Sequence, residues 1–172
     1  MPERPSLTPL VESLPATVPF VGPETQERAR GRSFRARLGA NENGFGPSLA
    51  VVAAMREAAP EMWKYGDPEN HDLKLALSAH LRLGPQNIVI GEGIDGLLGL
   101  AVRQYVRPGD AVVTSLGAYP TFNYHVAGFG GRLVTVPYEG DRENLSGLLD
   151  AAWRENARLV YLSNPDNPMG SW

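Results

Sequence analysis

The 172-residue chain contains no cysteine. This absence excludes disulfide bonds, a thiolate nucleophile and cysteine-ligated metal sites. The three histidines, His71, His80 and His125, lack the close spacing of metal ligands. We therefore expect neither cysteine chemistry nor a metal centre.

Lysine is scarce, since Lys64 and Lys74 are the only two, and the net charge of −3 gives no basic footprint for nucleic acid. No apolar run approaches the roughly 18 residues of a membrane span. The N-terminus also lacks the apolar core of a secretory signal. With 42% hydrophobic and 20% charged residues, the composition is typical of a soluble globular protein. We expect a cytoplasmic protein without nucleic-acid or membrane partners.

Residues 1–37 carry prolines at positions 2, 5, 9, 15, 19 and 23, which exclude a long helix. Five arginines between positions 28 and 37 make the end of this stretch basic. We expect an irregular N-terminal arm. It is either solvated or packed on a partner subunit.

Residues 38–86 predict a segment with two helices. The first begins after Pro47 and runs to about Ala59, where Pro60 stops it. The second spans about Asn70–Leu83, with leucines four residues apart on one face.

From position 87 onward, short β-branched runs alternate with apolar helical patterns. The predicted strands are Ile88–Ile90, Ala111–Ser115, Arg132–Val136 and Arg158–Ser163, and the predicted helices are about 95–106, 119–127 and 145–155. Such alternation predicts an α/β fold with three layers, in which helices cover both faces of a mostly parallel sheet. Ligands of these sheets bind outside the carboxyl ends of the strands.

A glycine-rich turn, Gly91–Gly96, joins the first predicted strand to an apolar helix. Free backbone N–H groups at such a helix N-terminus favour phosphate. The turn also fits the dinucleotide fingerprint, which requires an acidic residue at the end of the second strand. That strand ends at Ser115-Leu116-Gly117, and Asp110 precedes it. A Rossmann-like nucleotide-binding domain stays an alternative, as does a turn that only allows close packing.

Six motifs occur in register over the 135 residues from Leu38 to Trp172. They are Ala40-Asn41-Glu42-Asn43, Tyr65-Gly66-Asp67-Pro68, Gly91–Asp95, Pro108-Gly109-Asp110, Tyr119 and Asn164–Gly170. Together they resemble the pyridoxal-phosphate-dependent aminotransferases of class I and II, fold-type I, and within these the histidinol-phosphate aminotransferase branch. Gly44, Gly66 and Met169 depart from the usual proline, proline and threonine of the pattern.

The resemblance implies pyridoxal 5'-phosphate as the cofactor and assigns residues to it. The N–H groups of Gly93, Ile94 and Asp95 would hold its phosphate. Tyr119 would stack on the pyridine ring, and Asn167 would hydrogen-bond the ring hydroxyl oxygen.

The resemblance also implies a homodimer, with Tyr65 reaching the partner's cofactor phosphate and Asn43 on the substrate side. The substrates would be an amino acid or histidinol phosphate and a 2-oxo acid. The Schiff-base lysine is expected beyond Trp172, so no catalytic residue is assigned. We expect an N-terminal fragment that is inactive alone, in which residues 87–172 form the first part of the cofactor-binding large domain. A non-catalytic remnant is the remaining alternative.

Overall fold

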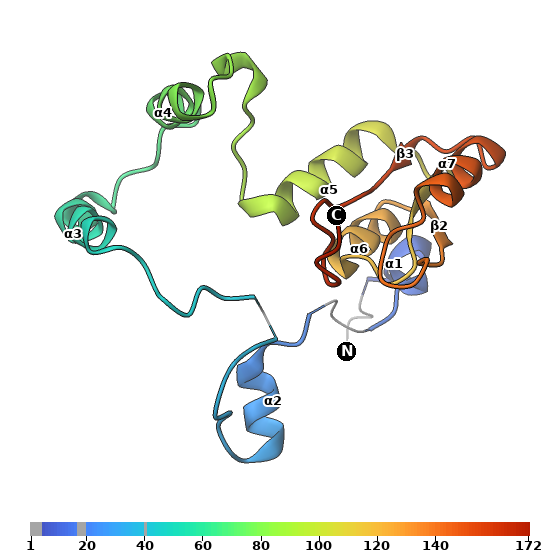
Figure 1. The fold of residues 1–172 in the computed structure, drawn as a ribbon, viewed down its shortest axis with the longest axis horizontal. Coiled ribbons are helices and arrows are strands. Elements are labelled where there is room, and N and C mark those ends of the chain that lie inside the picture. Colours follow the sequence, from blue (N-terminus) through green and yellow to red (C-terminus); the bar gives the residue numbers. More distant parts are fainter. Residues whose placement is uncertain (1–4, 17–19, 40) are drawn as a thin grey trace. The chain divides into compact units, whose positions relative to one another are not determined.

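The computed structural model describes residues 5–16, 20–39 and 41–172 (Figure 1). The chain divides into two compact units. We call Gly91–Trp172, with the described residues up to Phe20, the sheet unit, and Val21–Ile90 the helical unit.

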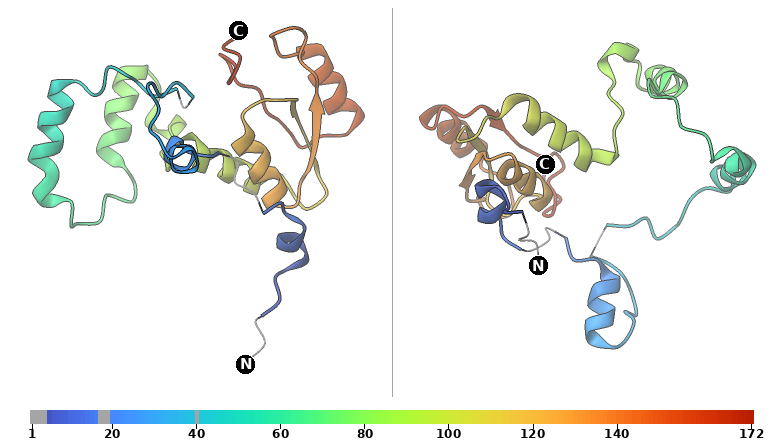
Figure 2. Two further views of the ribbon diagram at one scale, coloured as in Figure 1. Left: turned by 90° about the horizontal axis from the view of Figure 1, so that it is seen from below. Right: turned by 180° about the vertical axis from the view of Figure 1, so that it is seen from behind.

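The sheet unit contains a three-stranded parallel sheet in the order β2-β1-β3. The strands are β1 (Ala111–Ser115), β2 (Arg132–Val136) and β3 (Leu159–Val160). The helices are α5 (Gly93–Tyr105), α6 (Pro120–Gly128) and α7 (Leu145–Arg154). The core contacts of α5 and α6 lie on one face of the sheet and those of α7 on the other, as Figure 2 shows for α6 and α7. The predicted three-layer α/β architecture is confirmed.

The face under α5 and α6 is held by one apolar cluster. Its buried members are Val102, Val106, Val112, Phe122 and Val126. The Phe122 ring also stacks on Tyr161, with 4.3 Å between ring centroids and 18° between planes. Full burial of such a side chain contributes about 1.5–3 kcal/mol, so this cluster fixes both helices on the sheet.

The opposite face is held by Val113 of β1 and by Leu148 and Ala151 of α7. Adjacent residues of a strand point to opposite faces, so Val113 faces α7 while its neighbour joins the other cluster. In the sequence, one apolar face of this helix is formed by Leu145, Leu148, Leu149, Ala152 and Trp153. The structure buries Leu148, whereas Leu149 is 58% exposed and Trp153 is 84% exposed. The buried face of α7 is therefore centred on Leu148 and Ala151.

The bounds of β1 and β2 match the prediction, and β3 is shorter than the predicted Arg158–Ser163. The strand predicted at Ile88–Ile90 is wrong. Ile88 has extended backbone angles, φ −118° and ψ 122°, but the segment pairs with none of the described residues as a strand. Both edges of β1 are occupied by β2 and β3, and an extended segment without a neighbour forms no ladder.

The arm, residues 1–37, is less irregular than expected. Its described part contains α1 (Pro9–Ser13) and α2 (Pro23–Arg30), and each begins at a proline, which suits the first helical position. Positions 1–4 and 17–19 lie outside the described residues. Glu24 and Glu27 of α2 bind the Arg37 guanidinium at 2.7 and 2.8 Å.

The helical unit also contains the two helices predicted for residues 38–86. They are α3 (Leu49–Ala58), which runs into η1 (Ala59–Glu61), and α4 (His71–Leu81), which precedes η2 (Pro85–Asn87). No helix in the described ranges has the length and apolar content needed to cross a membrane.

The two adjacent leucines of α7 test how this helix packs. Leu148→Ala should lower the free energy of unfolding by about 2–5 kcal/mol, because Leu148 is 2% exposed and a cavity would remain. Leu149→Ala is the matched control and should change it by less than about 0.5 kcal/mol. Urea denaturation of both variants measures the difference, and equal losses would contradict the packing of α7.

Candidate functional site

The turns that follow the three parallel strands share one edge of the sheet, which we call the carboxyl edge. Tyr119 comes after β1 and Asn167 after β3, and these strands are neighbours. Tyr119 is half-buried and occupies the N-cap position of α6 without a side-chain capping bond, and Asn167 is exposed. The topology therefore brings two of the predicted cofactor residues to adjacent turns.

The N-terminus of α5 presents backbone donors, as the sequence predicted. Gly93 has φ +72°, a conformation that favours glycine, and its N–H donates to the Gly91 carbonyl oxygen at 2.8 Å. The N–H groups of Ile94 and Asp95 meet no acceptor within the described ranges. Two donors at the positive end of a 13-residue helix are suited to an anion, whereas the Gly93 N–H is already engaged.

The Asp95 carboxylate does not cap its own helix. Its Oδ1 lies 2.9 Å from His125 Nε2 on α6, so the negative charge is drawn toward α6. Gly99 makes this contact possible, because a Cβ at this position would lie 2.8 Å from Cε1 of the His125 ring. The small residue in α5 thus leaves room for the ring that holds Asp95.

Aromatic side chains gather where β1 and β3 end. Burial raises the pKa of Tyr161, and the neighbouring Tyr119 phenol adds to the rise. Because Tyr161 also stacks on Phe122, the α6 N-terminus that carries Tyr119 is tied to the end of β3.

The turn after β3 is organised by Asp166, a residue that the sequence analysis missed. Its side chain is buried and accepts hydrogen bonds from the Tyr138 and Ser163 hydroxyls and from the Met169 N–H. Asp166 lies between two Asn-Pro pairs and gives no signal in the sequence, since its partner Tyr138 lies 28 residues earlier.

A second carboxylate, Glu143, lies at the same edge. It accepts a hydrogen bond from the hydroxyl of Ser115, the last residue of β1, at 2.9 Å. Burial raises the pKa of Glu143, and the nearby Asp166 carboxylate adds to the rise.

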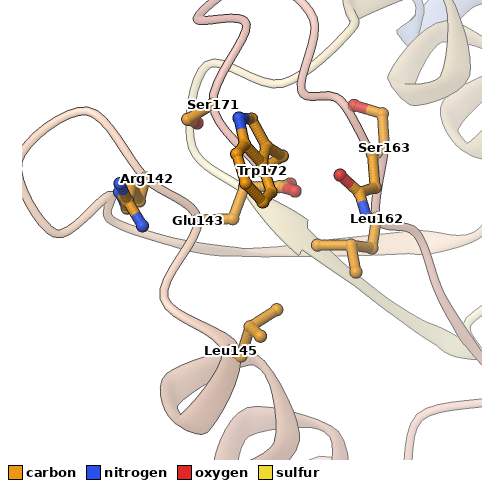
Figure 3. Close-up of a pocket in the computed structure, with 8 residues that line it drawn as sticks. Arg142, Glu143, Leu145, Leu162, Ser163, Ser171 and Trp172 are labelled. Atoms are coloured by element: carbon orange, nitrogen blue, oxygen red, sulfur yellow. The ribbon is translucent and has the colours of Figure 1, made fainter.

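Glu143 lines a hollow of about 200 Å³ that Figure 3 shows. The other lining residues come from the turns after β2 and β3, the start of α7 and the last two residues: Arg142, Leu145, Leu162, Ser163, Asn164, Ser171 and Trp172. None of the predicted cofactor residues lines it. The hollow is therefore a separate feature of the carboxyl edge from the predicted cofactor residues.

The remaining predicted residues belong to the helical unit. Tyr65 is fully exposed, and Asn43 accepts a hydrogen bond from the Phe45 N–H at 3.1 Å. Ala40 lies outside the described residues. The contacts of Tyr65 with a partner's cofactor and of Asn43 with substrate stay predictions. In the ranges that the structure describes, no group of three or more His, Asp or Glu side chains could hold a metal ion.

The fit between Gly99 and His125 can be tested by adding one methyl group. Gly99→Ala should lower the free energy of unfolding by about 1 kcal/mol, because overpacking of about 1–3 kcal/mol exceeds the gain in helix propensity. Gly128→Ala in α6 is the control, since its Cβ would meet nothing within 4 Å. Adding His125→Ala to Gly99→Ala should restore much of the loss in urea denaturation, and no restoration would show that the ring is not the obstacle.

The raised pKa of Glu143 predicts a pH-dependent stability. A pKa above the ordinary value means that stability is complete at low pH and declines as pH rises through the folded-state pKa. Glu143→Gln keeps an acceptor for Ser115 and cannot ionise. It should therefore melt at a higher temperature than the parent near pH 7 and at the same temperature below about pH 4. Glu139→Gln, at an exposed site in the same turn, should match the parent throughout, and equal melting of all three near pH 7 would refute the burial effect.

Comparison with known proteins extends over most of the chain. The sequence pattern of the family "Aminotransferase class I and II" matches residues 36–172. A histidinol-phosphate aminotransferase of Anaeromyxobacter sp. (strain Fw109-5) is 36% identical over 172 residues, covering 98% of this chain and 46% of that protein. Histidinol-phosphate aminotransferase 1 of Mesorhizobium japonicum is 38% identical over 139 residues, covering 80% of this chain and 37% of that protein.

A solved structure agrees with these relatives. The histidinol-phosphate aminotransferase from Sinorhizobium meliloti, crystallised with pyridoxal-5'-phosphate, is 65% identical and superposes with a TM-score of 0.93, covering 99% of this chain and 45% of that chain. The chain thus spans less than half the length of these relatives. It belongs to the class I and II aminotransferase family and is similar to its histidinol-phosphate aminotransferases.

Proposed function

We propose that this chain supplies the first part of the cofactor-binding domain of a pyridoxal-phosphate-dependent aminotransferase. The enzyme would move an amino group between an amino acid or histidinol phosphate and a 2-oxo acid. The observation that carries the proposal is the pair of free N–H groups, Ile94 and Asp95, at the start of α5. The Tyr119 and Asn167 turns belong to the same compact unit.

The donor set fits the cofactor. A phosphate monoester is an anion that the two N–H groups and the helix dipole would bind. The Tyr119 ring would pack against the pyridine, and the Asn167 amide would donate to the ring hydroxyl oxygen. When bound, pyridoxal phosphate supplies an electron-poor ring that stabilises negative charge on the amino acid's α-carbon.

The contact between Asp95 and His125 supports phosphate binding. A carboxylate in the first turn of a helix competes with a bound anion for the same N–H groups and dipole. The 2.9 Å contact with His125 holds the Asp95 charge on the α6 side. Its backbone N–H then remains available to the phosphate.

The helical unit would complete the site in a homodimer. Tyr65 would reach the partner's cofactor phosphate, and Asn43 would lie on the substrate side. The full exposure of Tyr65 is compatible with a contact to a second chain. The motifs around both residues fall within the family match over residues 36–172.

The lysine that bonds the cofactor is expected outside this chain. Lys64 forms an ion pair with Glu61, and Lys74 lies on α4. Neither lies where the family resemblance expects the Schiff-base lysine. The chain alone should therefore bind the cofactor without covalent attachment and without transaminating.

Titration of the chain with pyridoxal phosphate, followed by absorbance, tests the proposal. Tyr119→Ala should weaken binding about fivefold, since aromatic stacking contributes on the order of 1 kcal/mol. Tyr119→Phe keeps the ring and should bind like the parent, as should the exposed control Tyr105→Ala. Inorganic phosphate should compete. Absence of binding, or equal affinity of Tyr119→Ala and the parent, would overturn the proposal, and measurable transamination by the chain would overturn the lysine assignment.

A further inference from the structure

Tyr138 follows β2, yet it lies beside the turn that follows β1 and hydrogen-bonds to the turn that follows β3. Its ring is adjacent to Gly117 in the turn after β1, where a Cβ would lie 3.7 Å from Tyr138 Cε2. Its hydroxyl donates to the Asp166 carboxylate in the turn after β3, at 3.1 Å from Oδ1 and 3.0 Å from Oδ2. One side chain therefore bridges the turns that lead to Tyr119 and Asn167.

Asp166 connects this bridge to the backbone of its own turn. Its carboxylate accepts from the Ser163 hydroxyl at 3.2 Å and from the Met169 N–H at 3.1 Å. Its N–H donates to the Ser171 carbonyl oxygen at 2.8 Å, and its carbonyl oxygen accepts from Gly170 at 2.8 Å. Asp166 is 5% exposed, and a buried carboxylate is stable only when such donors surround it.

Asn167 is held by the same group of contacts. It adjoins Asp166 in sequence, and its N–H donates to the Ser163 hydroxyl oxygen at 3.2 Å. The Ser163 hydroxyl in turn donates to Asp166. The backbone of Asn167 is thus anchored through Ser163 and Asp166 to Tyr138, while its side chain stays available at the exposed edge.

We propose that Tyr138 and Asp166 are positioning residues, which hold the Asn167 turn against the Tyr119 turn so that both side chains meet one cofactor ring. The inference rests on the proposed function. It goes further because it assigns a role to two residues, Tyr138 and Asp166, to which the family resemblance gives none. A tyrosine suits this role because its phenol is a proton donor at neutral pH, and burial and Asp166 raise its pKa further, to about 12.

The first measurement is hydrogen exchange of backbone amides in the chain without cofactor. Tyr138→Phe removes only the hydroxyl and should speed exchange at Asn167 and Met169 about tenfold, because the Asp166 carboxylate loses a donor. Tyr105→Phe, the same change at an exposed site on α5, should leave these rates unchanged. Unchanged exchange in Tyr138→Phe would overturn the bridge, whether or not the chain binds cofactor.

The second measurement is pyridoxal phosphate affinity in a double-mutant cycle. Tyr138→Phe should weaken binding several-fold in the parent and should have no further effect when Asn167→Ala is already present. Asp166→Asn should behave like Tyr138→Phe. The absorbance maximum of the bound cofactor should shift in the same direction in Tyr138→Phe as in Asn167→Ala, because both disturb the bond to the ring hydroxyl.

The outcomes separate the two proposals. If the parent binds no cofactor, the proposed function fails, while the exchange rates still decide whether Tyr138 holds the turn. If the parent binds and exchange rises in Tyr138→Phe without loss of affinity, the bridge only braces the fold and the positioning role is refuted. If Tyr138→Phe weakens cofactor binding as much in the Asn167→Ala variant as in the parent, Tyr138 does not act through Asn167. That result would also refute the positioning role.

Discussion

The burial of β1 on both faces is the constraint on which the sheet unit depends. All five of its residues are buried, and β2 and β3 pair with its two edges. Val112 joins the cluster under α5 and α6, and Val113 joins the one under α7. A central parallel strand fixes its neighbours in direction, so the turns after all three strands open at one edge. The proposed cofactor contacts of Tyr119 and Asn167 follow from that arrangement.

The elements closest to β1 were predictable from local sequence. The β-branched run Ala111–Ser115 comes after a Pro-Gly-Asp turn, and the regular alternation with helices predicts a parallel sheet. The segment Ile88–Ile90 has the same local character and still forms no strand in the described chain. Pairing depends on a neighbour elsewhere in the chain, which a short sequence window does not contain. A helix in this region was correctly predicted, because helix N-termini have their own local signals, but α5 begins at Gly93 and includes most of the expected Gly91–Gly96 turn.

The packing of α7 and the polar contacts at the carboxyl edge were harder to predict from the sequence. Five apolar residues share one face of α7 in the sequence, whereas the residues that the structure buries are Leu148 and Ala151. Asp166 and Glu143 are ordinary acidic residues in the sequence, and their partners Tyr138 and Ser115 are each 28 residues away. The roles expected for Gly93–Asp95 come from the family resemblance and stay predictions, and the Gly93 N–H already donates to the Gly91 carbonyl oxygen.

The position of Tyr138 between two other turns limits how the turns of the sheet unit can change in length. Turns at the ends of parallel strands are usually replaceable one at a time, since each is anchored only by its own strand. Here an insertion or deletion between Val136 and Tyr138 would displace a ring that lies beside Gly117 and a hydroxyl that donates to Asp166. Loop grafting after β2 would thus alter two other loops without changing their sequences. Because Tyr138 couples the three turns, we expect their lengths to change together.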